Sequence, residues 1–372
     1  PIGIKKKFDN LANNLRTTLF VVVSKSGGTP EPKLCMDQAR NITEQKGYNW
    51  PSRSVAITMA NSELDKKAKD EKWLTRFDLP DWVGGRTSIT SAVGLLPITL
   101  IKSDIRQFLL GASIMDKHTR TKDIYLNPAS LLASSWYIAG SAKGLKDMVV
   151  LPYCDNLEVI SKYLQQLVME SLGKSQDRNS KVVNQGLAVY GNKGSTDQHA
   201  YVQQLRDGID NFFVTFIEVL SNNNVLPVLE NKNPSDFLSG FLQGTRLALS
   251  ENNRENITLT LKSFSSFQLG ALIALFERTV GLYAELVNIN AYNQPGVEAG
   301  KKAAADILKI QNNIDKLLSN GNKHSLQDLF DKLGTPNKDA VFMIIRNMTI
   351  SNPTYEVNGD WSRPNTLEIK KI

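Results

Sequence analysis

The chain has 372 residues, and 44 Lys plus Arg against 37 Asp plus Glu give it a formal net charge of +7. Hydrophobic residues make up 41% and charged residues 22%, which excludes wholesale disorder and collagen-like structure. No apolar run approaches the length of a membrane span, which is about 20 residues. The basic residues are too dispersed to indicate a nucleic-acid partner.

The first part of the chain reads as strands that alternate with helices. Residues 17–23 (TTLFVVV) form a continuous apolar, β-branched run, which is typical of a strand buried on both faces of a parallel sheet. We expect a second buried strand over 54–58 and helices over 31–45 and 128–142. Residues 79–101 read as a loop-rich stretch.

The same alternation continues downstream. Short apolar runs predict strands over 148–152, 186–190 and 211–219. Longer amphipathic or apolar segments predict helices over 158–172, 196–206, 234–250, 267–286 and 296–318. Because strands joined by helices form parallel sheets with helices on both faces, the sequence predicts an α/β fold of three layers.

The region from His324 onward has a different order of elements. We expect two short helices followed by a hairpin, over 325–333, 338–348, 354–356 and 367–369. This order is that of a small winged-helix-like α+β module. Its second helix carries only Lys338 and Arg346 as basic residues, so we favour a packing role over nucleic-acid binding.

These patterns predict four parts in the chain. They are the C-terminal part of a first α/β domain over 1–125, a second α/β domain over 126–300, a helix over 301–323 and the small module over 324–372. The basic run from Pro1 to Arg16 reads as the tail of a helix that enters a strand. We therefore expect the first domain to lack its opening portion.

The loop after the first predicted strand, SKSGGTPE, is rich in hydrogen-bond donors. The hydroxyls of Ser24, Ser26 and Thr29 lie close in sequence to the ammonium group of Lys25, and two glycines let backbone N–H groups approach a ligand. The loop opens a helix, whose N-terminus favours an anion. The pattern favours a phosphate-binding loop. The alternative is an ordinary strand-to-helix turn with a capping hydroxyl.

Two further positions carry residue types suited to acid–base chemistry. Gln166 and Glu170 are four residues apart in one predicted helix, so they share a face, and Met169 gives that face apolar surface. Such a carboxylate can serve as a general base, or it can be an ordinary solvated glutamate. Arg86 follows two glycines, and its guanidinium suits a developing oxyanion, although a surface turn is the alternative.

Three more residues stand out by their placement. His199 lies in the first turn of a predicted helix after a Gly-rich loop, where it can be an acid–base group or a capping partner. Gln294 and Lys301 are seven residues apart, two helical turns, so they project to roughly the same side. The alternative for Lys301 is a solvated lysine.

Four motifs follow one another along the chain. They are SKSGGTPE at 24–31, VGGRTS at 83–88, GNKGSTDQH at 191–199, and LGALIA at 269–274 with QPGVEAGK at 294–301. Together they resemble the sugar isomerase (SIS) domains and, among these, the glucose-6-phosphate isomerase family. The resemblance covers about residues 15–305, and the tail after His324 is similar to an extension in the cyanobacterial and plastid branch.

The resemblance implies two SIS-type domains and the interconversion of glucose 6-phosphate and fructose 6-phosphate through a cis-enediolate, without metal or organic cofactor. It implies that Glu170 is the base, that Arg86 stabilises the enediolate, and that His199 with Lys301 opens the sugar ring. It further implies that the substrate and its phosphate are bound by Ser24, Lys25, Ser26, Thr29, Gly85, Gln166 and Gln294. The family's GIGGS loop does not occur in these 372 residues.

The resemblance also implies a homodimer in which His199 reaches the active site of the partner subunit. A different class of function is a non-catalytic SIS protein that binds a phosphosugar and regulates another process. Such a protein would not need Glu170, Arg86, His199 and Lys301 together, and the chain has all four. We therefore favour the enzyme, with a small sugar phosphate as its substrate.

The remaining cysteines, histidines and tryptophans suggest no second site. Two cysteines make no disulfide framework and three histidines no metal-spaced cluster, which fits a reducing, cytoplasmic compartment and a protein without a metal. We expect buried packing for Cys35, Cys154, Trp73, Trp82 and Trp136, and surface positions for His118 and His324.

Overall fold

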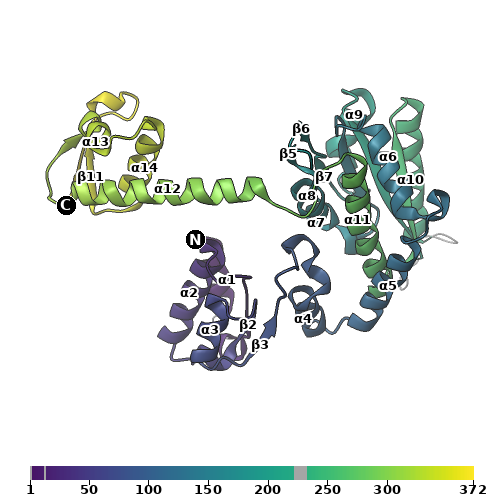
Figure 1. Cartoon of the computed structure of the whole chain (residues 1–372), viewed down its shortest axis with the longest axis horizontal. Helices are drawn as coiled ribbons and strands as arrows, with labels where there is room; N and C mark the ends of the chain where they lie inside the picture. The colour runs from purple at the N-terminus through teal and green to yellow at the C-terminus, as the bar shows by residue number, and fades with distance from the viewer. Residues whose placement is uncertain (1, 12–13, 222–232) are drawn as a thin grey trace. The chain divides into compact units, whose positions relative to one another are not determined.

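The structure, a computed structural model, describes residues 2–11, 14–221 and 233–372, without the side chains of residues 2, 297–299, 301 and 302. Its contacts divide it into two compact units, Pro1–Tyr292 and Asn293–Ile372 (Figure 1). The predicted α/β class is confirmed by parallel sheets in the first unit. None of the described helices combines the length and the apolar character that a membrane span requires.

The first unit begins with a small parallel sheet of order β1-β2-β3. Its strands and the helices around it are β1 (Phe20–Val23), β2 (Ser54–Thr58), β3 (Thr75–Asp78), α1 (Ile2–Leu11), α2 (Pro30–Gln45) and α3 (Glu63–Asp70). β2 is fully buried, as predicted, because it lies between the other two strands. β1 is shorter than predicted and only half-buried, since β2 is its one neighbour in the described sheet.

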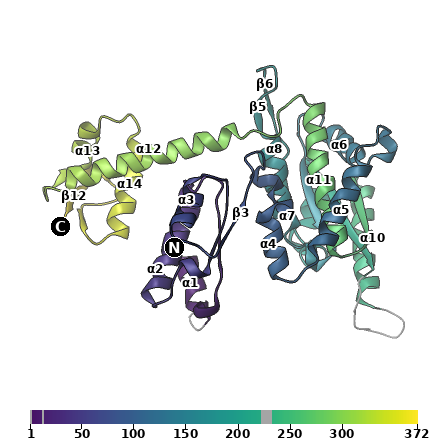
Figure 2. The same ribbon diagram turned by 60° about the horizontal axis from the view of Figure 1, so that its bottom comes forward.

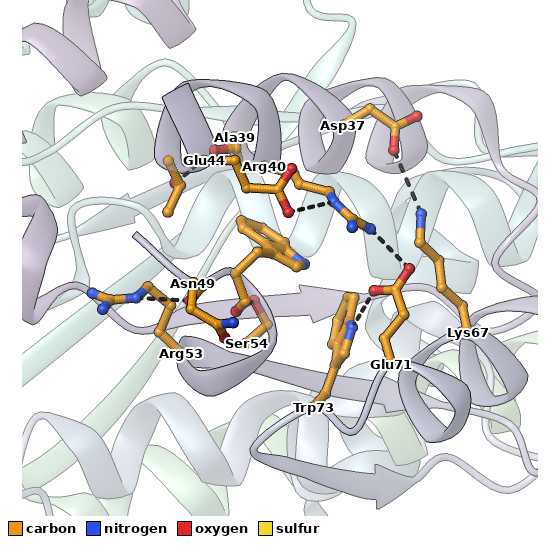
Figure 3. Close-up of polar contacts among 12 residues, drawn as sticks. Asp37, Ala39, Arg40, Glu44, Asn49, Arg53, Ser54, Lys67, Glu71 and Trp73 are labelled. Atoms are coloured by element: carbon orange, nitrogen blue, oxygen red, sulfur yellow. Dashed lines mark hydrogen bonds and ion pairs between the residues drawn. The ribbon is translucent and has the colours of Figure 1, made fainter. Parts of the chain in front are cut away.

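A polar network ties α2 to α3 on one side of this sheet (Figure 3). Arg40 of α2 donates to Glu71, just after α3, at 2.8 Å, and the indole N–H of Trp73 donates to the same carboxylate at 2.8 Å. The Lys67 ammonium of α3 lies 3.8 Å from a carboxylate oxygen of Asp37 of α2. Beneath these contacts the two helices bury Met36 and Leu64. The network therefore fixes α2, whose N-terminus follows the donor-rich loop.

A helical segment follows that the sequence did not predict in full. It contains the 3₁₀ segment Gly85–Thr90 (η3), α4 (Ala92–Leu100), α5 (Ile105–His118), the 3₁₀ turn Ile124–Leu126 and α6 (Pro128–Ala139). α4 lies inside the stretch expected to be loop-rich, and Ser91 caps it by accepting from the Val93 N–H. α6 begins as predicted because Asn127 caps it and Pro128 occupies its first turn.

Helices α5 and α11 (Ser266–Leu286) cross with their backbones in close approach (Figures 1 and 2). A Cβ on Gly111 of α5 would lie 1.9 Å from the carbonyl oxygen of Phe267, and one on Gly270 of α11 would lie 1.9 Å from that of Phe108. Both glycines are therefore required by the crossing.

The second sheet has the order β7-β4-β8-β9, and all its strands are parallel. They are β4 (Asp147–Pro152), β7 (Val189–Gly191), β8 (Phe212–Ser221) and β9 (Asn256–Ser263). β9 was not predicted, and β7 begins three residues later than expected. Helices α6 and α11 cover one face, and α9 (Gln198–Asp207) and α10 (Pro234–Glu251) cover the other, which makes the predicted three layers (Figure 2).

The predicted helix 158–172 is interrupted by a π turn. It consists of α7 (Ile160–Leu164), the π turn Gln165–Met169 and α8 (Glu170–Leu172). An antiparallel hairpin of β5 (Lys174–Gln176) and β6 (Val182–Gln185), also not predicted, comes directly after it. π turns are frequent at functional sites, since the extra residue re-aims the side chains that follow.

The second unit is built on α12 (Pro295–Leu318), α13 (Leu326–Leu333) and α14 (Lys338–Ser351). They pack against a three-stranded antiparallel sheet of β10 (His324–Ser325), β12 (Glu368–Lys371) and β11 (Tyr355–Asn358), in that order. The expected hairpin partners thus pair, and α12 belongs to the same core through Ile314 and Leu318. The finer winged-helix assignment and the four predicted domain boundaries stay predictions.

Three predictions about burial are wrong. Cys35 is exposed on α2, and Trp82 is 81% exposed, because the turn that carries it lies at the rim of a cavity. His324 is only 6% exposed, since its backbone pairs with Ile369 in β12 and its ring lies against the ammonium of Lys332 at 3.1 Å. Cys154, Trp73 and Trp136 are buried as expected.

Candidate functional site

The donor-rich loop 24–29 connects β1 to α2. Ser24 is buried and its hydroxyl accepts from the Gly27 N–H at 3.1 Å, while the Ser26 hydroxyl accepts from the Gly28 N–H at 3.1 Å. Thr29 holds the N-cap position of α2 without a side-chain cap hydrogen bond. The three hydroxyls therefore keep their own O–H donors for a ligand, at a helix N-terminus that favours an anion.

The conformation of the loop depends on Gly27. Its φ is +82°, and a Cβ there would lie 2.5 Å from the backbone nitrogen of Leu64. We expect Gly27→Ala to destabilise the protein by about 1–3 kcal/mol and to weaken binding of inorganic phosphate by roughly tenfold. Thermal unfolding and phosphate titration measure both effects.

The matched control for this prediction is Gly28→Ala in the same loop. The atoms nearest to a Cβ there are the Ser26 hydroxyl at 3.7 Å and a Glu63 carboxylate oxygen at 3.8 Å, so the methyl group fits. It should leave stability and phosphate binding close to those of the unchanged chain. Equal losses in both variants would contradict the role given to the positive φ of Gly27.

Lys25 points away from the loop toward the segment before η3. Its ammonium donates to the carbonyl oxygens of Asp81 and Val83, the latter at 3.2 Å. It also lines a cavity of about 190 Å³ together with Gly84 and Arg86. The loop is therefore joined to the Gly-Gly-Arg segment by Lys25, a link that sequence spacing did not predict.

Arg86 is 6% exposed and is held from three directions. One terminal nitrogen donates to the Ser171 hydroxyl at 3.0 Å and to the Ala291 carbonyl at 2.8 Å, and the other donates to the Tyr292 carbonyl at 3.1 Å. Burial lowers the pKa of Arg86, and the charge of Glu170 opposes that shift. These contacts use three of its five N–H donors and leave others to meet a developing negative charge.

Gln166 and Glu170 lie next to this arginine. A Cβ on Gly85 would be 3.9 Å from the side-chain nitrogen of Gln166, so the amide lies directly over that glycine. Glu170, half-buried, follows the π turn and acts electrostatically on Arg86. The structure thus brings together Gly85, Arg86, Gln166 and Glu170, with a carboxylate and a guanidinium group close to each other.

Three other predicted site residues have no described contact with this cluster. His199 is the second residue of α9 and is exposed, and no described contact joins it to the cluster. Gln294 is half-buried at the N-cap position of α12 in the second unit. Lys301 lies on α12, but its side chain is outside the described residues.

Comparison with known proteins shows which family the chain resembles. The model of the phosphoglucose isomerase family matches residues 2–255 and 245–326. The chain is 65% identical over 371 residues to a glucose-6-phosphate isomerase of Prochlorococcus marinus strain MIT 9211, covering all of the chain and 69% of that relative. The chain belongs to the phosphoglucose isomerase family. A glucose-6-phosphate isomerase of Synechococcus sp. strain CC9902 is 58% identical, with 70% of its length covered.

Two solved structures are similar to this fold. A crystal structure of a glucose-6-phosphate isomerase from Chlamydia trachomatis is 28% identical, with a TM-score of 0.75 over 93% of this chain and 66% of that one. A hypothetical protein from Thermus thermophilus is 27% identical, with a TM-score of 0.73 over 80% of this chain and 74% of that one.

Sequence reasoning gave no role to two residues that lie close to this cluster. Lys174 is 5% exposed and lies beside Glu170, and burial together with the charge of Arg86 lowers its pKa to about 8. Glu277 lines the same cavity as Arg86, and burial raises its pKa to about 7. The Tyr163 hydroxyl, which donates to Glu277 at 3.4 Å, acts in the opposite direction and lowers this pKa. Neither the burial of these two side chains nor the resulting pKa shift is visible in a sequence.

Proposed function

We propose that the chain catalyses the interconversion of D-glucose 6-phosphate and D-fructose 6-phosphate. The observation that carries the proposal is the pairing of Glu170 with Arg86 beside Lys25 of the donor-rich loop, in a member of the phosphoglucose isomerase family. An aldose–ketose isomerisation requires a base for the carbon-bound proton and a group that stabilises the enediolate oxygen. It also requires an anchor for the phosphate, and it consumes no oxidant or reductant.

Each step can be assigned to a side chain of the chain. The loop Ser24–Thr29 binds the phosphate, and Gln166 and Gly85 position the sugar. His199 and Lys301 open the ring by moving a proton between the ring oxygen and the hydroxyl at the anomeric carbon. Glu170 then removes the proton from C2, and Arg86 stabilises the enediolate. Glu170 returns the proton to C1, while the hydroxyl proton on O2 passes to O1. Gln294 contacts the substrate, and no metal or organic cofactor takes part.

The second part of the proposal is that the enzyme is a homodimer. His199 is exposed at the start of α9, which supports a role in a site outside its own chain. A C2 dimer would repeat this contact, so that each chain lends His199 to the other. We further propose a cytoplasmic location, which the two free cysteines support.

The decisive experiment supplies glucose 6-phosphate to the full-length protein in deuterated water and follows the sugars by NMR. We expect fructose 6-phosphate to form and deuterium to enter at the carbon that receives the returned proton, because the base exchanges with solvent. The competing function, a non-catalytic phosphosugar-binding regulator, predicts saturable binding with neither product nor deuterium. Binding without conversion would refute the isomerase.

A further inference from the structure

Lys174 is the most buried ammonium group beside the cluster. It is the first residue of β5, and its side chain folds back over the end of the helix that carries Glu170. Its nitrogen donates to the carbonyl oxygen of Glu170 at 3.0 Å and to that of Ser171 at 2.7 Å. The last carbonyls of a helix have no partner within the helix, and a cation there also meets the negative end of the helix dipole.

The helix end that Lys174 holds is short and irregular. Only α8, three residues long, separates the π turn Gln165–Met169 from Gly173, where the chain leaves the helix. The Gly173 N–H donates to the Met169 carbonyl at 2.9 Å, and a Cβ on Gly173 would lie 2.8 Å from that oxygen. One turn of ordinary helix cannot fix the direction of the Glu170 side chain by itself, since helix ends fray readily.

The same contacts reach the arginine. Ser171, whose carbonyl accepts from Lys174, also accepts from Arg86 through its hydroxyl. A chain of hydrogen bonds therefore runs from Lys174 through Ser171 to Arg86. The charged groups that act on the ammonium are Arg86 of η3, which disfavours its charge, and Glu170 of α8, which favours it.

We propose that Lys174 is a positioning residue that holds the Glu170 turn and the Arg86 guanidinium in register for proton transfer. The inference rests on the proposed isomerase function. Lys174 need not touch the substrate. Its ammonium holds the carbonyl oxygens of Glu170 and Ser171 and so fixes the backbone that orients the Glu170 carboxylate. Because a misplacement of about 1 Å can lower a rate about 10²-fold, loss of this anchor should act on the chemical step rather than on binding.

The first test compares Lys174→Met with Lys181→Met, a lysine on the same β5–β6 hairpin that is exposed. In the full-length protein we expect Lys174→Met to lower kcat by roughly tenfold or more while KM changes by less than about threefold. Amide hydrogen exchange at residues 170–173 should become faster. Lys181→Met should change none of these quantities. A folded Lys174→Met with unchanged kcat and exchange would overturn the proposal.

The second test uses charge and does not depend on the stability of Lys174→Met. The pKa of Lys174 is lowered to about 8, so the ammonium loses its proton, and the anchor weakens, as pH rises through that value. We expect kcat of the unchanged enzyme to fall there. Lys174→Arg stays charged at that pH, so its alkaline decline should move up by about one pH unit or more. An identical decline in both proteins would overturn the proposal.

These tests separate this inference from the proposed function. If the unchanged protein does not isomerise glucose 6-phosphate, the proposed function fails. In that case faster exchange at residues 170–173 in Lys174→Met, but not in Lys181→Met, still supports the anchor. If the unchanged protein is active and both Lys174 variants behave like it, only the role of Lys174 fails.

Discussion

Replacing Glu170 with glutamine should lower kcat for isomerisation by about 10²–10⁴-fold, the effect expected when a general base is removed. Glutamine keeps the size of the side chain but cannot accept the C2 proton. Glu170 is half-buried between the π turn and Lys174, so the fold should tolerate the change. Coupled assays of fructose 6-phosphate formation measure kcat, and NMR in deuterated water measures exchange of the carbon-bound proton.

The matched control is Glu158→Gln, an exposed glutamate just before α7 in the same helical region. It should leave kcat and exchange unchanged, and both variants should keep their affinity for inorganic phosphate, because the loop 24–29 is intact in both. Solvent exchange that persists in Glu170→Gln would show that another group is the base, and Glu277 in the neighbouring cavity would then be the first to test.

Mixing two inactive variants should restore activity if His199 acts in the partner's site. In a dimer formed from one His199→Ala chain and one Glu170→Gln chain, one site carries both defects and the other carries neither. Random pairing makes about half of the dimers mixed, so about a quarter of the original activity should return if the sites act independently. Refolding the two chains together and assaying the mixture measures this recovery.

A second mixture supplies the control. Arg86 and Glu170 interact within one chain, so mixing Arg86→Lys with Glu170→Gln places one defect in each site of a mixed dimer. No activity should return beyond that of the two parents. Native mass spectrometry shows whether mixed dimers form. Equal recovery in both mixtures, or none in the first although mixed dimers are present, would contradict the shared site.

The sequence predicted those elements whose pattern is local. β2 lies at 54–58 as expected, because its apolar run is visible in the sequence. α2 differs from its prediction by one residue at its start, where Pro30 marks the first turn. β9 was missed although NITLTLKS alternates apolar and polar residues and Asn252 and Asn253 end the helix before it. The π turn inside 158–172 was not predictable, since it leaves the helical pattern of apolar residues intact.

The candidate site was predictable in its residue types but not in its contacts. The motifs pointed to Arg86 and Glu170 as individual residues. The carbonyls of Ala291 and Tyr292 that hold Arg86 lie more than two hundred positions downstream. Every residue has a backbone carbonyl, so the sequence does not show which carbonyls bind the arginine. The burial of Trp82 and of His324 was predicted wrongly. Aromatic character favours burial and polarity favours exposure only on average, and the local turn or strand determines the exposure of each side chain.

The close crossing of α5 and α11 limits how the protein can move. Gly111 and Gly270 each lie against the backbone of the other helix, so the two helices cannot slide past each other and move as one rigid unit. Any displacement of α5 therefore moves α11 with it, together with the core side chains that α11 packs against β4 and β8. Upstream of α5, Lys25 joins the loop 24–29 to the carbonyl oxygens of Asp81 and Val83.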